Sequence, residues 1–302
     1  MSRILHLHNG SKLKKSIPSL FIGHTGIQYI KLDNEKKPKK FGEISFSNKD
    51  DENEVKEGLR ILVKKNKFKK VNLVIPDSEI STFFITVYLD SRKNKRSAIE
   101  DYIQKNIQLD PKEIVLDYDV VSYKDNVLSA SVVVISKTKY NWYKEILSSL
   151  KIKAERIIGE SLALSKSIIK NGNNEPHLII NILPRYTTLS MIGDGVVYKT
   201  DFLNGSIDDV NKFSKKINSF MLSWYSQIGR VVHDRSHHIV VISHDDEMLK
   251  KTISSLRNVL NHIDVRKGSA WDNCFDIDDY IPKIHKKDLY RYSSAIGGCL
   301  FK

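Results

Sequence analysis

Apolar and polar residues alternate over much of the N-terminal quarter of the chain, as half-buried β-strands require. Residues 19–32 and 40–47 alternate in this way and are joined by the polar stretch DNEKKPKK, which predicts two adjacent strands. Residues 52–65 instead carry their apolar side chains at helical spacing. Residues 69–80 then predict a buried strand that Pro76 ends.

The next stretch reads as a separate small unit. Strand patterns at 81–89, 113–121 and 127–136 enclose one helical pattern at 97–108. Residues 76–135 therefore predict a compact strand–helix–strand–strand module, inserted into the first half of the chain.

The opening pattern recurs after the linker KNGNNEP at 170–176, where Asn, Gly and Pro are concentrated. Residues 177–203 give three strands with turns, and a long helix follows at 208–228. Two similar halves that face one cleft predict an α/β architecture with a natural place for a ligand. The predicted organisation is a basic polar tail at 1–16, a first lobe at 17–75 and 136–170, the module at 76–135, and a second lobe at 171–302.

The composition is that of an ordinary folded protein, with 40% hydrophobic and 9% aromatic residues in 302. The start is polar and basic, unlike a signal peptide, and no run approaches the ~20 apolar residues of a bilayer span. The two cysteines, Cys274 and Cys299, lack CxxC spacing and nearby histidines, which argues against disulfides and zinc. These features predict a cytoplasmic protein, soluble or peripheral to a membrane.

The formal charge of +13 comes largely from lysine clusters at 12–15, 36–40, 64–70 and 92–96. The clusters lack interleaved aromatic or glycine-rich elements, so we do not expect nucleic-acid binding. A solvated surface is the favoured interpretation. Contact with an anionic membrane surface or an acidic partner is the alternative.

One turn has features of a phosphate-binding loop, because FIGHTGIQYIKL at 21–32 has glycines that let backbone N–H groups point into a bend. A second stretch, NILPRYTTLS at 181–190, opens the other half. With LVIPDSEISTFFITV, ILSSLKIKAERIIGESLAL and SSAIGGCLF in the same order, the chain resembles the PilM family of type IV pilus assembly proteins. That family belongs to the superfamily of actin, the large heat-shock ATPases and FtsA, and the resemblance runs from about residue 17 to the end.

The resemblance implies a two-lobed, actin-like (ribonuclease-H-like) fold in which the module replaces one actin subdomain. It also implies two aspartates that position Mg²⁺ and water, and both are missing, because His24 and Asn181 stand at their positions. Leu183 replaces a loop glycine and Pro184 removes an N–H donor. We therefore expect no catalytic residue, metal or cofactor, and ATP with Mg²⁺ is disfavoured. The residues left to contact a nucleotide in these altered loops are Thr25, Gly26, Thr187, Thr188 and Gly205.

Single residues outside these loops offer little chemistry. For His24, a turn histidine that hydrogen-bonds backbone carbonyls is favoured over a phosphate or metal contact, because no second ligand lies at a motif position. Cys274 has no nearby base that would make it a nucleophile. The pair of histidines at 237–238 begins a strand, and alternation would send the two rings to opposite faces.

The leading functional hypothesis is a scaffold of a type IV pilus, or related secretion or competence, machine at the inner face of the cytoplasmic membrane. The resemblance implies a PilN-like partner whose cytoplasmic tail lies in a groove between the first lobe and the module, and pilus motor or platform proteins are further candidates. The apolar residues nearest that groove are Phe83, Phe84, Val87 and Tyr88. The alternatives are an actin-like ATP-binding protein with a remodelled site, an FtsA-like cell-division adaptor and a GspL-like secretion-platform domain.

Overall fold

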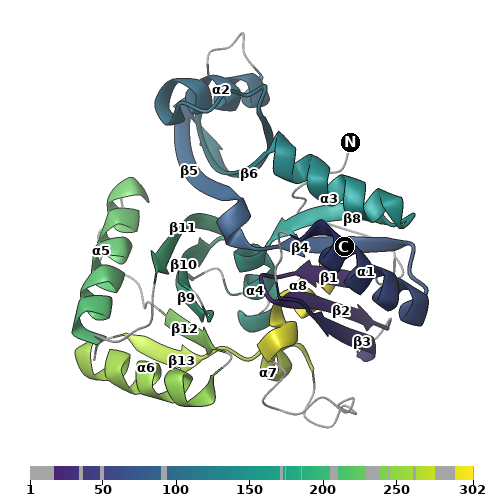
Figure 1. Cartoon of the computed structure of the whole chain (residues 1–302). Coiled ribbons are helices and arrows are strands. Elements are labelled where there is room, and N and C mark those ends of the chain that lie inside the picture. Colours follow the sequence, from purple (N-terminus) through teal and green to yellow (C-terminus); the bar gives the residue numbers. More distant parts are fainter. Residues whose placement is uncertain are drawn as a thin grey trace.

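The protein is built from two lobes and a smaller sheet that projects from them (Figure 1). The computed structural model describes residues 17–33, 37–47, 51–89, 94–170, 173, 175–184, 186–204, 210–228, 238–243, 245–260, 263–275 and 290–301. The predicted tail at 1–16 lies outside these residues.

The first lobe contains a five-stranded mixed sheet in the order β3-β2-β1-β4-β8. Its strands are β1 (Ser19–Ile22), β2 (Gly26–Leu32), β3 (Pro38–Ser45), β4 (Lys70–Ile75) and β8 (Lys153–Gly159). Helix α1 (Glu52–Asn66) covers one face of this sheet, where Ile27 packs close to Gly58. Asp51 starts α1 because its carboxylate accepts the N–H groups of Asn53 and Glu54, which have no partner within the helix.

The projecting sheet has the strand–helix–strand–strand order that the sequence predicts. It is entered through the short 3₁₀ turn η1 (Asp77–Glu79) and has the strand order β5-β7-β6. Its elements are β5 (Ser81–Tyr88), α2 (Lys95–Tyr102), the π-helical turn η2 (Ile103–Ile107), β6 (Ile114–Lys124) and β7 (Val127–Ser136). Ile99 and Ile103 pack with Ile85, Leu128 and Val132 in a core that belongs to this module alone. Helix α3 (Lys137–Ser149) then leads back to β8.

The second lobe repeats the arrangement of the first. Its sheet has the order β11-β10-β9-β12-β13, in which an antiparallel meander is followed by two parallel strands, as in the first sheet. The strands are β9 (His177–Ile182), β10 (Tyr186–Gly193), β11 (Val196–Asn204), β12 (His238–Ser243) and β13 (Asp264–Lys267). The helices α5 (Val210–Ile228) and α6 (Asp246–Val259) pack on it. No helix in the described ranges is both long and apolar enough to cross a membrane.

The end of the chain returns to the first lobe, which differs from the predicted second lobe at 171–302. Helix α8 (Ser293–Cys299) packs on β1, β2 and β4 and against α4 (Glu160–Ile168), while α7 (Ala270–Cys274) also contacts α4. The packing is so close that a Cβ at Gly297 would lie 1.8 Å from the backbone oxygen of Ala163. Buried Asn72 fixes the helix end, because its Nδ2 donates to the Gly298 carbonyl at 2.9 Å.

Candidate interlobe site

The two predicted phosphate turns face each other across a cavity of about 450 Å³ between the lobes. His24, Thr25 and Gly26 line it from the β1–β2 turn, and Leu183 and Pro184 line it from the β9–β10 turn. The two turns that the resemblance singled out therefore lie at one cavity. Whether Thr25 and Gly26 contact any nucleotide stays a prediction.

Side chains of this protein bridge the two turns. The His24 and Tyr186 rings meet edge to face, with 5.3 Å between ring centroids and an 88° angle between planes. The Nε2 atom of His24 also lies 2.9 Å from the Ser78 hydroxyl in η1. His24 thus links the first lobe, the entry to the module and the second lobe.

Gly26 has a structural reason to be glycine. A Cβ there would lie 2.7 Å from the carbonyl oxygen of Ile44 on the neighbouring strand β3. Only glycine lets the two backbones approach this closely. The glycine is therefore required by the sheet whatever the cavity holds.

Asn181 forms a hydrogen bond to a buried acidic side chain at the wall of the cavity. It lines the cavity, and its Nδ2 donates to Glu160 Oε1 of α4 at 3.3 Å. The Ser294 hydroxyl of α8 donates to the same oxygen at 3.2 Å. These bonds join the end of β9 to α4 and α8 around a carboxylate that is only 3% exposed.

The two predicted threonines do not reach the cavity. Thr187 and Thr188 are each 2% exposed within β10, and neither lines the space that the two turns enclose. Gly205 falls outside the described residues. The nucleotide contacts proposed from sequence are thus divided, with Thr25 and Gly26 at the cavity and the threonine pair in the sheet.

Sequence reasoning missed Tyr186, the second-lobe half of the bridge. Burial, followed by the nearby Glu160, raises the pKa of the Tyr186 hydroxyl, so the ring stays neutral at physiological pH. The sequence indicates Tyr186 only weakly, as an aromatic residue two positions after Pro184. Its role depends on the β1–β2 turn, which lies about 160 residues earlier in the chain. The relevant contact exists only once both lobes are folded.

Restoring the missing aspartates should not create an ATPase. We predict that the double variant His24→Asp, Asn181→Asp releases phosphate from Mg·ATP no faster than the buffer. Leu183 and Pro184 still line the phosphate side, and a second carboxylate at 181 would lie against Glu160 and resist ionisation. Phosphate release measured on the folded variant tests this, and turnover above background would show that the altered loops still assemble a catalytic site.

Cys274 makes a structural contact. Its thiol donates to the Ser167 carbonyl at 3.3 Å and so joins α7 to α4. The described residues contain no grouping of three or more histidine, cysteine or acidic side chains able to hold a metal ion.

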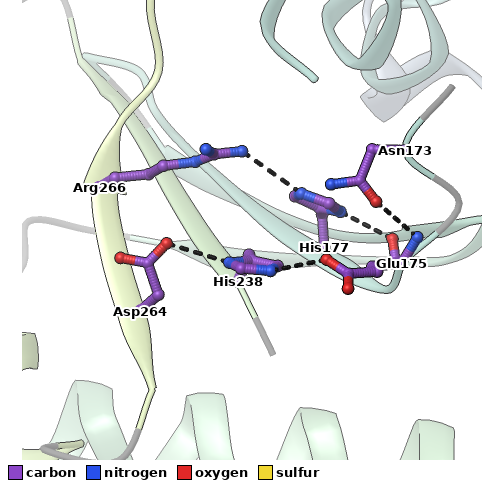
Figure 2. A network of polar contacts seen from close by, with 6 residues as sticks. All are labelled: Asn173, Glu175, His177, His238, Asp264 and Arg266. Atoms are coloured by element: carbon purple, nitrogen blue, oxygen red, sulfur yellow. Dashed lines mark hydrogen bonds and ion pairs between the residues drawn. The ribbon is translucent and has the colours of Figure 1, made fainter. Parts of the chain in front are cut away.

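A separate polar cluster lies at the start of β9, β12 and β13 (Figure 2). The His177 and His238 rings stack with centroids 5.0 Å apart. His238 Nδ1 lies 3.0 Å from Asp264, and its Nε2 lies 2.9 Å from Glu175. His177 places Nδ1 2.7 Å from the Glu175 carbonyl, and burial lowers its pKa, which favours its neutral form. The cluster ties the linker to the starts of three strands, and the other predicted histidine, His237, lies outside the described residues.

Asp77 is buried where the first lobe, the module and the second lobe meet. Its carboxylate accepts the Ser161 N–H at 3.0 Å and the Ser161 hydroxyl, which also contacts Ser190 of β10. Burial raises the pKa of Asp77 to about 6, although the Ser161 donors oppose this. The folded state therefore binds the Asp77 proton more tightly than the unfolded chain does.

This shift predicts a pH dependence of stability with a defined sign. Protonated Asp77 stabilises the folded state fully below the pKa that the carboxyl group has in the unfolded chain, near 4. This stabilisation is lost as pH rises through the pKa in the folded state, about 6. The Asp77→Asn variant cannot ionise at this position. Its free energy of unfolding relative to that of wild type should therefore rise by on the order of 2 kcal/mol between pH 4.5 and pH 7. Urea unfolding of both proteins at the two pH values measures this, and an equal difference at both would contradict it.

No family model matches the sequence, and no curated protein matches it either. Solved structures do match the fold. A chain of the PilM–PilN type IV pilus biogenesis complex aligns with a TM-score of 0.69 at 13% identity, covering 94% of this chain and 98% of that one.

Two other solved structures align less closely. The cytoplasmic domain of EpsL, an inner-membrane component of the type II secretion system of Vibrio cholerae, has a TM-score of 0.50 at 10% identity, covering 75% of this chain and 82% of that one. A protein of unknown function with an actin-like ATPase fold from Bacteroides thetaiotaomicron also reaches 0.50, at 12% identity, with 88% and 94% covered. The chain therefore has a two-lobed actin-like fold, and its resemblance to PilM holds at the level of that fold.

Proposed function

We propose that this chain is a cytoplasmic scaffold of a type IV pilus or related secretion machine, which holds the tail of a single-span inner-membrane protein. The observation that carries the proposal is the fold match to a chain of the PilM–PilN complex, which leaves almost no part of either chain unmatched. The second support is the cleft, where His24 and Tyr186 bridge the turns that would otherwise hold phosphate. A scaffold needs the two-lobed fold but no nucleotide turnover, so a cleft with bridged turns suits this role.

The surface that best fits a tail is a groove of about 440 Å³ between α3 and β8. Leu147, Ile152 and Ile157 form its apolar floor. Lys144, Lys153 and Glu155 form part of its rim, where Lys153 Nζ lies 3.4 Å from Glu155 Oε1. Tyr140 lies at the side, partly buried. An apolar floor with a polar rim suits a peptide that places a few apolar side chains inward and keeps its polar groups in water.

The groove fits an extended segment. It runs along α3, which joins the module to the first lobe, and along β8, the last strand in the order of the first sheet. A tail that emerges from a membrane can lie along such an edge as an added strand, with main-chain contacts giving affinity and side-chain pockets giving specificity. The occupant we propose is the N-terminal cytoplasmic tail of a single-span membrane protein, with apolar anchors for the floor and an acidic residue that can pair with Lys144.

The residues that the sequence suggested on β5 are used largely for packing. Val87 is buried in the module core, and Phe84 packs on Tyr198 of the second lobe with ring centroids 4.8 Å apart. Val87 therefore offers a partner no surface, which corrects its assignment. Phe83 packs partly against the module core, while Tyr88 is 72% exposed and remains a candidate contact.

Isothermal titration with synthetic peptides tests the proposal. The peptides come from the cytoplasmic N-termini of single-span membrane proteins encoded beside this chain. Docking orders a flexible segment, so we expect a dissociation constant on the order of micromolar. Binding of an acidic tail should weaken between low and physiological ionic strength, because Lys144 lies at the rim. If no such peptide binds, the scaffold proposal fails.

A secretion-platform role is the second candidate, favoured by the fold match to the EpsL cytoplasmic domain. The match is weaker and leaves a quarter of this chain uncovered. The two candidates differ in the partner, so the same titration separates them when tails from pilus-type and secretion-type membrane proteins are compared.

A further inference from the structure

One end of the first lobe collects lysines from segments that lie far apart in the sequence. Strands β1, β4 and β8 run parallel, β2 is antiparallel to β1, and β3 is antiparallel to β2. The strands β1, β3, β4 and β8 therefore all begin at the end of the sheet where β2 finishes. Helix α1 also finishes there, because a short loop joins it to β4 (Figure 1). This lysine edge consists of the exposed side chains of Lys39, Lys40, Lys64, Lys65, Lys67, Lys69, Lys70, Lys151 and Lys153.

The lysine edge keeps most of its positive charge. Glu155 Oε1 lies 3.1 Å from Lys70 Nζ and 3.4 Å from Lys153 Nζ, and the hydrogen bond from Lys70 is the main reason why the pKa of Glu155 is lowered. Asp33, at the end of β2, accepts the backbone N–H of Lys37 at 2.9 Å. The other lysines of the edge have no ion-pair partner in the part of the chain that the structure describes.

The stretch KKNKFKK at 64–70 shows which kind of partner suits this edge. Its two other side chains face inward: Phe68 stacks on Tyr29 with ring centroids 4.7 Å apart, and Asn66 Nδ2 donates to the Leu62 carbonyl at 3.1 Å. The stretch thus exposes charge without an apolar or aromatic anchor. The centre of a protein interface needs apolar side chains, and single-stranded nucleic acid needs rings on which its bases stack. Anionic lipid headgroups need neither, because they attract lysines by charge.

We propose that the lysine edge lies against the anionic headgroups of a membrane leaflet. Clusters of about four to eight lysines or arginines beside a membrane are typical of segments that bind anionic lipids. The start of β8 also belongs to the groove between α3 and β8, since Lys153 lines that groove and is the cross-strand neighbour of Lys70. A membrane at the lysine edge would therefore lie at one end of the groove. The lipid contact goes beyond the proposed function, because it needs no tail and can be measured without one.

Sedimentation of the full chain with lipid vesicles, in the absence of any peptide, tests the proposal. Vesicles of phosphatidylglycerol and phosphatidylcholine in equal parts supply the anionic surface, and vesicles of phosphatidylcholine alone are the neutral control. We expect binding to the anionic vesicles only. Because salt screens exposed charges, this binding should weaken by about tenfold or more between low and physiological ionic strength.

Two variants with the same loss of net charge locate the contact. The edge variant combines Lys64→Gln, Lys65→Gln, Lys67→Gln and Lys69→Gln. The control variant combines Lys215→Gln, Lys216→Gln, Lys250→Gln and Lys251→Gln, at exposed positions of α5 and α6. Each lysine near an anionic surface contributes about fivefold to binding, so the edge variant should bind the anionic vesicles at least about 30-fold more weakly than wild type. The control variant should stay within about threefold of wild type, because charges far from the surface are screened.

The proposal is overturned if the full chain does not bind the anionic vesicles, or binds the neutral ones as well. It also fails if the control variant loses as much binding as the edge variant, which would show an effect of net charge alone. Duplex DNA attracts lysines through its phosphates, and DNA that releases the chain from vesicles at equal phosphate concentration would assign the edge to nucleic acid instead. These results are independent of the tail titration, so failure of either proposal is recognised without the other.

Discussion

Gly297→Ala is expected to destabilise this protein more than any other single methyl addition to its helices. The new Cβ would lie 1.8 Å from the Ala163 carbonyl oxygen, 2.5 Å from its carbon and 3.1 Å from its Cα. These are backbone atoms of α4, so no side-chain rotation relieves the clash and α8 must move away from the sheet. We predict a loss of about 3 kcal/mol or more in the free energy of unfolding, measured by urea denaturation.

Gly58→Ala is the matched control, because Gly58 is also a buried glycine within a helix. Its Cβ would lie 3.1 Å from Ile44 Cγ2 and 3.3 Å from Ile27 Cδ1, which are ends of side chains that can shift. Alanine gains up to about 1 kcal/mol in helix propensity over glycine, so this variant should stay within about 1 kcal/mol of wild type. Equal stability of the two variants would mean that α8 does not pack on α4 as described.

Tyr140→Ala should remove most of the affinity for a membrane-protein tail. Tyr140 lies at the side of the groove between α3 and β8, and aromatic side chains in such positions often contribute 2 kcal/mol or more to binding. We therefore expect the dissociation constant of the peptide to rise about 30-fold, as measured by isothermal titration. Lys144→Glu, at an exposed position, should weaken binding of an acidic tail without affecting the fold.

Tyr88→Ala provides the control for the other candidate surface. Tyr88 is 72% exposed on the module, and its removal should change the dissociation constant less than twofold if the tail lies along α3. The reverse pattern, with Tyr88→Ala weakening binding and Tyr140→Ala leaving it unchanged, would place the tail on the module instead. Circular dichroism melting shows whether each variant is folded.

The repeated architecture could be predicted from sequence because it depends on local patterns. Each half opens with alternating strands joined by a short turn, and the two sheets indeed share one strand order. The position of α8 could not be predicted in this way. Its small residues indicate close packing, but the partner, fixed by Asn72 and Ala163, lies more than 130 residues earlier in the chain.

The cleft was predicted in part. Motif positions located His24, Asn181 and Leu183 at the cavity, because turns keep their place in a fold when their chemistry changes. Tyr186 was missed, since its role arises from a contact across the lobes.

The alternation along β5 already shows that the four candidate tail-binding residues cannot all line one groove. Val87 and Tyr88 are successive strand residues, so they project to opposite faces and could not both line one groove. The structure accordingly buries Val87 and exposes Tyr88. A groove between a helix and a strand, in contrast, depends on how α3 lies on β8, which no local pattern reports.

Hydrogen exchange of the folded protein, measured alone, with the tail peptide and with Mg·ATP, tests the central claim most directly. If the chain is a scaffold, the peptide slows exchange of amides in α3 and β8, and Mg·ATP changes exchange nowhere. Protection of the turns at 22–26 and 182–186 by Mg·ATP, with no effect of the peptide along α3 and β8, would contradict the account.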